Sequence, residues 1–153
     1  MDFQENIRTG NTEELSKKLE ADSSLKDKKD SKGFPPLVLA TYFDQPEVTK
    51  LLLDKGAEVD ARDSAGNTAL MGVCYKGNLD IVKLLISNGA DVNARNFSGT
   101  TPLIFSAMFE QHEVARLLLE SGADKSMRDA KGNTAYAYAR HKSNLEMSSL
   151  LKV

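Results

Sequence analysis

Few side chains in this 153-residue sequence could carry out nucleophilic or metal chemistry, and the single cysteine is the first of them. A cysteine becomes a nucleophile when a neighbouring histidine or another cation stabilises its thiolate. Cys74 has no histidine near it, and its counterparts in the periodic pattern of the chain are Thr41 and Ala107. We therefore expect Cys74 to be a small buried residue between helices. A single cysteine also fits a reducing compartment.

The two histidines are also poorly placed for catalysis or metal binding. His112 lies beside Glu113 in a segment that we interpret as a solvated turn. His141 stands between Arg140 and Lys142, whose charges would repel a metal ion. With no cysteine cluster and no paired histidines, we expect no metal site and no cofactor. The glycines are spaced for turns and are not grouped as in a phosphate-binding loop. The sequence therefore predicts a protein that is not an enzyme.

The composition narrows the possible partners and location. Hydrophobic residues make up 41% and charged residues 27% of the chain, which is typical of a folded domain. The net charge of -2 gives no broad positive field, so we expect no nucleic-acid binding. The first residues are acidic and polar, unlike a signal peptide, and the aliphatic runs are too short to span a bilayer. We expect a cytoplasmic protein that does not bind membranes.

A fixed period organises the chain. One series of glycines recurs at a constant interval, at Gly33, Gly66, Gly99 and Gly132, and a second keeps the same interval, at Gly56, Gly89 and Gly122. Aliphatic triplets recur in phase with them, at residues 51–53, 84–86 and 117–119. Series in phase like these indicate a repeat protein, in which each unit is one supersecondary element.

Each unit can be interpreted physically. A turn begins at Asp63, and Gly66 tolerates the positive φ that such a turn needs. Thr68 then caps a short apolar helix, because its hydroxyl can accept a hydrogen bond from a free amide. The first full repeat has Pro35 at this position, so we expect that helix to lack its cap. The second helix should end at Gly89 in a left-handed conformation.

Two stretches of the unit resemble the signatures of the ankyrin-repeat family. They are DSAGNTAL at residues 63–70 and GADVNA at residues 89–94, and residues 96–103 and 122–124 match them again. The resemblance covers nearly the whole chain, which is similar to small stand-alone ankyrin-repeat proteins of bacterial type. It implies an all-α solenoid of antiparallel helix pairs with projecting β-hairpin-like loops, about five repeats including two caps.

The chain departs from the family pattern at one position. The family usually places a histidine directly after the Thr-Pro-Leu stretch, where this sequence has Val38, Met71, Ile104 and Ala137. We expect apolar packing to replace the polar contacts of that histidine.

The repeats divide the chain into a single domain, 1–153. Residues 1–29 resemble a degenerate capping repeat whose insertion falls in a loop around Asp22. Residues 145–151 give a last helix with one buried stripe, so we expect a complete capped array. The division is 1–29 for the N-terminal cap, 30–62, 63–95 and 96–128 for the full repeats, and 129–153 for the C-terminal cap.

In this architecture, the loop tips and the exposed ends of the inner helices line a concave face, and the resemblance implies that a partner protein binds there. The loop-tip candidates are Phe34, Asn67 and Phe97. The helix-end candidates are Tyr42, Phe43, Tyr75, Lys76, Met108, Phe109, His141 and Lys142. Arg62, Arg95 and Arg128 precede successive turns and would form a basic ladder.

Two questions stay open for these candidates. The aromatic side chains could form an exposed apolar centre that a partner buries, or some of them, Phe34 and Phe43 above all, could fold down and seal the stack. Each arginine could meet acidic groups of a partner, or could pair with a neighbouring aspartate such as Asp63.

The sequence therefore predicts a protein–protein interaction module that is monomeric when unbound, with a partner that carries an acidic surface. One alternative is an immunity protein or inhibitor that neutralises a toxin or enzyme by direct binding. A second alternative is an enzyme, for which the sequence offers no catalytic group.

Overall fold

The computed structural model describes all residues 1–153 and contains ten α-helices, one short 3₁₀ helix and no strand. The elements are α1 (Phe3–Thr9), α2 (Thr12–Ala21), the 3₁₀ helix η1 (Ser23–Asp27), α3 (Pro36–Tyr42), α4 (Pro46–Asp54), α5 (Ala69–Lys76), α6 (Leu79–Ser87), α7 (Pro102–Met108), α8 (His112–Glu120), α9 (Ala135–His141) and α10 (Leu145–Leu151). The predicted all-α class is therefore confirmed.

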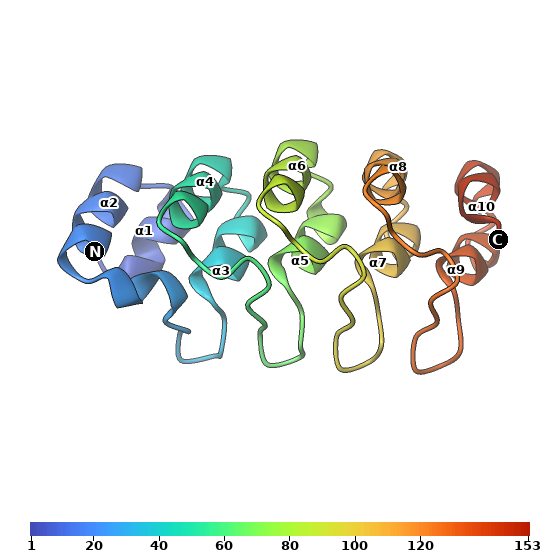
Figure 1. Ribbon diagram of the computed structural model, residues 1–153, viewed down its shortest axis with the longest axis horizontal. Helices are drawn as coiled ribbons and strands as arrows, with labels where there is room; N and C mark the ends of the chain where they lie inside the picture. The colour runs from blue at the N-terminus through green and yellow to red at the C-terminus, as the bar shows by residue number, and fades with distance from the viewer.

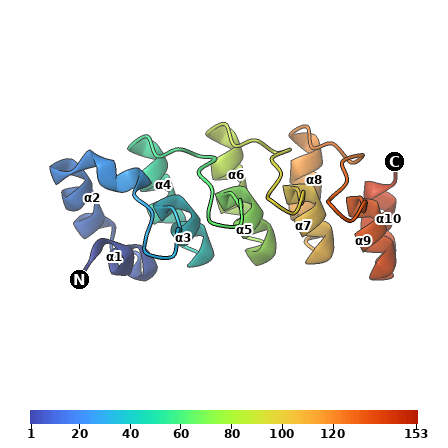
Figure 2. The ribbon, with the colours of Figure 1, turned by 90° about the horizontal axis from the view of Figure 1, so that it is seen from below.

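The helices form two parallel rows (Figure 1). The odd-numbered helices make one row and the even-numbered helices make the other, and each odd helix packs against the even helix that follows it. We call the two rows the inner and the outer helices. Long loops, which we call fingers, project from the inner row in Figure 1, and Figure 2 shows the pairs following one another in chain order with the termini at opposite ends. The arrangement is the predicted solenoid.

The inner helices begin where the cap residues predict. Thr68, Thr101 and Thr134 each accept a hydrogen bond through the side-chain oxygen, from the amides of Met71, Ile104 and Ala137 at 3.4, 3.2 and 3.2 Å. Pro35 offers no such bond, as predicted. A threonine cap of this kind contributes about 1 kcal/mol, so α3 depends more on its packing than the other inner helices do.

The fingers are held by one side chain each. Asp63 Oδ1 accepts from the amides of Ala65 and Asn67, both at 2.9 Å, while the Asp63 amide donates to the Asn67 carbonyl at 2.9 Å. Neighbouring fingers then join directly, because the Phe97 amide donates to the Ala65 carbonyl at 3.1 Å. These bonds give each finger the shape of a hairpin.

The core repeats along the solenoid. Leu37, Leu70 and Leu103 of the inner helices are almost completely buried, and so are Leu52, Leu85 and Leu118 of the outer helices. Each helix pair buries its apolar side only against its neighbours, so the core is continuous through the stack.

Val38, Met71 and Ile104, which replace the family histidine, are buried in the apolar interior, as predicted, and Ala137 is half-buried.

The segment around Asp22, predicted as a loop, contains the 3₁₀ helix η1. The Asp22 carboxylate accepts from the Ser24 amide and hydroxyl at 3.1 and 2.6 Å. The additional residue is therefore absorbed by a capped helical turn.

Candidate protein-binding face

The surface of interest lies beside the fingers, where the inner helices end. We call it the inner face, and it is the surface that the family resemblance predicts to be concave. The helix-end positions Tyr42, Tyr75, Met108 and His141 follow one another at intervals of one repeat length, so α3, α5, α7 and α9 present them in one row. The side chains of Tyr42 and Tyr75 are 59% and 55% exposed.

Five rings on this face form what we call the aromatic stripe: Tyr42, Phe43, Tyr75, Phe105 and Phe109. Tyr75 of α5 meets Phe109 edge to face with ring centroids 4.8 Å apart, and Tyr42 meets Phe43 in the same way at 5.2 Å. Phe105 stacks on Phe109 at 6.0 Å. The ring pair between Tyr75 and Phe109 therefore connects neighbouring repeats.

Lys76 connects the two halves of the stripe. Its Nζ lies 5.2 Å from the Tyr42 ring centroid and 5.8 Å from that of Tyr75. An ammonium group over two aromatic faces is attracted by both rings. The stripe thus runs from α3 across α5 to α7 with a cation at its centre, and no aspartate or glutamate pairs with that cation.

The structure distinguishes exposed side chains from packed ones among these candidates. Phe34, Phe43 and Met108 are half-buried and pack against the core. Tyr42 and Tyr75 are exposed, and Phe109 is 38% exposed. The sealing role considered for Phe34 and Phe43 therefore agrees with their positions.

Two finger residues lie away from the stripe. Phe97 is 76% exposed at its finger tip, and its ring lies so close to Gly66 that a Cβ there would come within 2.8 Å of it. Asn67 is half-buried, and its Oδ1 accepts from Asn96 Nδ2 at 2.9 Å. Asn67 therefore connects two fingers, whereas the Phe97 ring lies over Gly66 of the preceding finger and stays largely exposed.

The three arginines of the ladder do not pair with aspartates. Arg62 Nη1 donates to the carbonyls of Gly66 and Arg95, both at 2.8 Å, and Arg95 Nη2 donates to the Arg128 carbonyl at 2.9 Å. Arg128 Nη1 donates to the Gly132 carbonyl at 2.8 Å. Arg62 and Arg95 thus connect successive fingers through backbone oxygens, and Arg128 braces its own finger. No carboxylate neutralises the charge of the three guanidinium groups.

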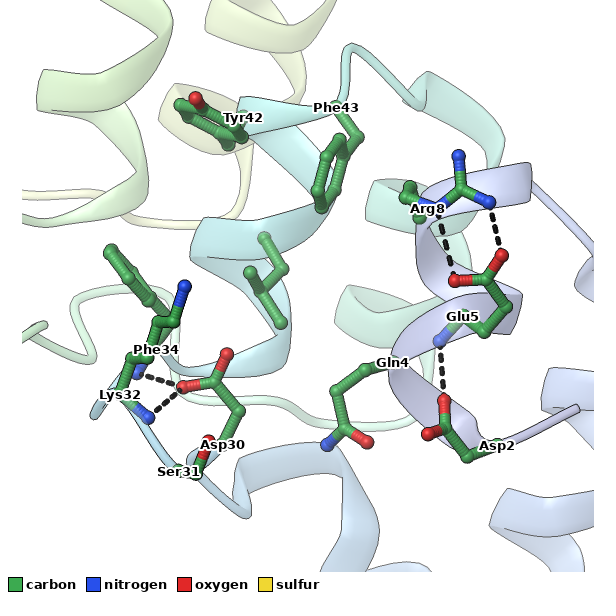
Figure 3. Close-up of a pocket in the computed structure, with 11 residues that line it drawn as sticks. Asp2, Gln4, Glu5, Arg8, Asp30, Ser31, Lys32, Phe34, Tyr42 and Phe43 are labelled. Carbon is green, nitrogen blue, oxygen red and sulfur yellow. Dashed lines mark hydrogen bonds and ion pairs between the residues drawn. The ribbon is translucent and has the colours of Figure 1, made fainter.

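A hollow of about 430 Å³ opens between α1, the first finger and α3 (Figure 3). Tyr42, Phe43 and Leu39 line it from α3, and the finger contributes Asp30, whose Oδ1 accepts from the amides of Lys32 and Phe34 at 2.9 Å. Its walls are therefore partly aromatic and partly charged.

The α1 wall of this hollow is missing from the candidates that the sequence supplied. It carries Asp2, Gln4, Glu5 and Arg8, and the ion pair with Arg8, chiefly through its hydrogen bonds, lowers the pKa of Glu5. Glu5 and Arg8 precede Leu39 and Tyr42 by one repeat length plus the additional residue near Asp22, and that spacing could have revealed them.

The last two candidates, His141 and Lys142, are exposed at the end of α9. His141 lines a second hollow of about 290 Å³ together with Lys131, Asn133, Ala137 and Tyr138. The Tyr138 hydroxyl donates to the Asp129 carboxylate, which is buried. Burial alone would raise the pKa of Asp129, but the hydrogen bonds from Tyr138 and from the amides of Asn133 and Lys131 outweigh it and lower that pKa.

The residues first considered for chemistry lie elsewhere. Cys74 is completely buried, and burial raises the pKa of its thiol, so the thiolate is disfavoured. His112 is the first residue of α8, and its Nε2 lies 3.1 Å from Asn144 Oδ1. The solvated turn predicted for His112 is therefore wrong, because the side chain contacts the next helix pair. The structure has no group of three or more His, Cys, Asp or Glu side chains that could hold a metal ion.

Comparison with known families agrees with this geometry. A family model described as "Ankyrin repeats (3 copies)" matches residues 7–96, 37–129 and 71–152, which together span most of the chain. The chain belongs to the ankyrin-repeat family. Ankyrin repeats are generally protein–protein interaction modules and typically non-catalytic. None of the curated proteins compared with this ankyrin-repeat chain matches it. None of its helices has the length and apolar character needed to cross a membrane.

Proposed function

We propose that this ankyrin-repeat protein is a non-catalytic interaction module of the cytoplasm, monomeric when unbound, which binds a partner protein on its inner face. The observation that carries the proposal is the aromatic stripe, because it crosses three neighbouring repeats while Tyr42, Tyr75 and Phe109 remain exposed. Contiguous exposed apolar surface usually marks an interaction site. Tyrosine and other aromatic residues also dominate the binding energy of protein interfaces.

The charges nearby support a partner with an acidic surface. Lys76 lies within the stripe, and the guanidinium groups of Arg62, Arg95 and Arg128 have no carboxylate partner. Such charges mainly set orientation and association rate, while the buried aromatic side chains supply the affinity.

The test is affinity capture from a lysate of the source organism, read by mass spectrometry. The bait is the wild-type chain, the Tyr75→Ala/Phe109→Ala variant, or a control variant, Lys83→Ala/Glu120→Ala, whose changes lie on the exposed side of α6 and α8. We expect the inner-face variant to capture at least about tenfold less of the partner, because two hot-spot side chains are removed. Equal capture by all three baits would contradict the proposal.

The captured complex also separates the two forms of this function. A one-to-one complex in which the partner's activity is abolished assigns an inhibitor or immunity role, and a complex in which that activity persists assigns an adaptor role.

A further inference from the structure

One glycine of the inner face has no explanation within the chain itself. Nine of the ten glycines have a positive φ, which side chains rarely adopt, and Gly72 is the tenth. It lies inside α5, where glycine destabilises a helix relative to alanine. The backbone at Gly72 therefore does not require glycine and is weakened by it.

The packing around Gly72 does not require glycine either. A Cβ added there would meet only Thr41 Oγ1, at 3.6 Å, which is an ordinary van der Waals contact. At Gly66, by contrast, an added Cβ would come within 2.8 Å of the Phe97 ring. Position 72 thus has room for at least a Cβ, and none is present.

The empty position lies in the middle of a row of large side chains. At intervals of one repeat length, Leu39 precedes Gly72, and Phe105 and Tyr138 follow it. Leu39 lines the hollow beside α1, and Tyr138 lines the hollow beside α9. Position 72 is therefore the one place in this row without a side chain, and we call it the notch. It lies on the same helix as Tyr75 and Lys76.

Several basic side chains are exposed on the inner helices α5 and α9 and on the last finger. Lys76, Lys131, Arg140 and Lys142 are all exposed, and none of them forms an ion pair. Of the nearby carboxylates, Asp129 is buried and already accepts a hydrogen bond from Tyr138. Glu110 is exposed and accepts from Asn144 Nδ2 at 3.3 Å, so the basic side chains outnumber the exposed carboxylate. A segment that crosses this surface is therefore favoured when it carries negative charge.

We propose that the notch at Gly72 receives one bulky apolar side chain from an extended, acidic segment of the partner protein. The acidic residues of that segment lie over Lys76 and Lys142. Packed helices are about 10 Å apart, so the distance from α5 to α9 is about 20 Å, which an extended segment covers in about six residues. The proposal rests on the proposed function, since it specifies the partner of the same face.

The test is a selection from a random peptide library displayed on phage, with the full chain as the target. We expect the enriched peptides to share one bulky apolar residue followed or preceded by acidic residues within about six positions. Enriched peptides without this pattern, or a selection that yields none with it, would overturn the proposal.

Variants then locate the bound peptide. Gly72→Leu fills the notch and should weaken peptide binding by at least about tenfold, measured by fluorescence anisotropy with a labelled peptide. Lys83→Leu adds the same side chain to the exposed side of α6 and should leave the affinity unchanged. Gly72→Ala should raise the midpoint of thermal unfolding and lower the affinity for the peptide. A glycine with a purely structural role would not give this combination. Full affinity in Gly72→Leu would overturn the proposal.

Gly72→Leu also distinguishes a failure of the notch proposal from a failure of the proposed function on which it rests. If capture of the partner from lysate is lost in Tyr75→Ala/Phe109→Ala but kept in Gly72→Leu, the inner face binds the partner and only the role proposed for the notch is wrong. If both variants capture the partner normally, the inner face itself is wrong.

Discussion

Each inner helix has a side that hardly changes along the solenoid and an end that changes in every repeat. On the buried side, Leu37, Leu70 and Leu103 recur without variation in the three full repeats, and only α9, in the last repeat, differs, with Tyr136 at this position. At the exposed end, the corresponding row reads Tyr42, Tyr75, Met108 and His141. Both rows advance by one repeat length from each residue to the next, so the difference reflects what each side contacts. The buried side must fit the next repeat, whereas the exposed end is free to suit a partner.

The largest expected difference between the two sides is in stability. Leu85→Ala removes a fully buried side chain and should lower the free energy of unfolding by about 2–5 kcal/mol. Tyr75→Ala removes a half-exposed ring with its edge contact to Phe109 and its contact with the Lys76 ammonium, so its cost should stay below about 1.5 kcal/mol. Urea denaturation measures both. Equal losses would show that the two sides are not energetically distinct.

A smaller effect is expected at the helix starts, which belong to the constant framework. Thr101→Ala removes the hydroxyl that accepts from the Ile104 amide at 3.2 Å and should cost about 1 kcal/mol. Thr101→Ser keeps that hydroxyl and is the matched control. If the alanine variant unfolds at the same urea concentration as the serine variant, the cap does not stabilise α7.

In the turn between an inner and an outer helix, a substitution should stabilise the protein, whereas the substitutions above destabilise it. Gly77 adopts φ 79° there, and Ser143 adopts the same left-handed conformation with φ 56°. Because that conformation costs a residue with a Cβ about 1 kcal/mol, Ser143→Gly should stabilise the protein by up to that amount. Ser149→Gly, inside α10, should instead destabilise it by about 0.5 kcal/mol. Thermal unfolding measures both, and a destabilising Ser143→Gly would contradict the strain argument.

The smallest effect concerns acid sensitivity at the last finger. The pKa of Asp129 is lower in the folded protein than its ordinary value of 3.8, so its carboxylate stabilises the fold above that pH. This contribution is lost as the pH falls below about 3.8 through the lower folded value. Asp129→Asn should therefore be less stable than wild type at pH 7, and the gap in unfolding midpoint should close toward pH 3. A gap that stays constant would contradict the assignment.

The helix caps and the finger turns were predictable from the sequence because their signals are local and recur in successive repeats. Thr68 and Thr101 cap their helices through contacts within one turn, and Asn96 takes the place of an aspartate by offering the same side-chain oxygen to the amides of Ser98 and Thr100 at 2.9 Å. Such features depend on neighbours within a few residues, so their residue types were sufficient.

The details of the candidate site depend on contacts between repeats, and the sequence could not supply them. Whether Phe43 packs inward while Tyr42 stays exposed is decided by side-chain rotamers. The carbonyl that Arg62 reaches belongs to Arg95, one repeat length away in the next finger. Phe105 and Gly72 could have been noticed, because they occupy the same row as Leu39. The row of Leu39 can be interpreted only when the structure shows that Leu39 and Tyr138 line the two hollows.

The most direct test of the inner face is site-specific photocrosslinking in living cells of the source organism. A photoreactive phenylalanine analogue is placed at Tyr75 on the inner face or at Lys83 on the outer side of α6, both of which are exposed. The account predicts that a protein partner becomes covalently attached through position 75 and not through position 83. Attachment through position 83 with none through position 75 would contradict it.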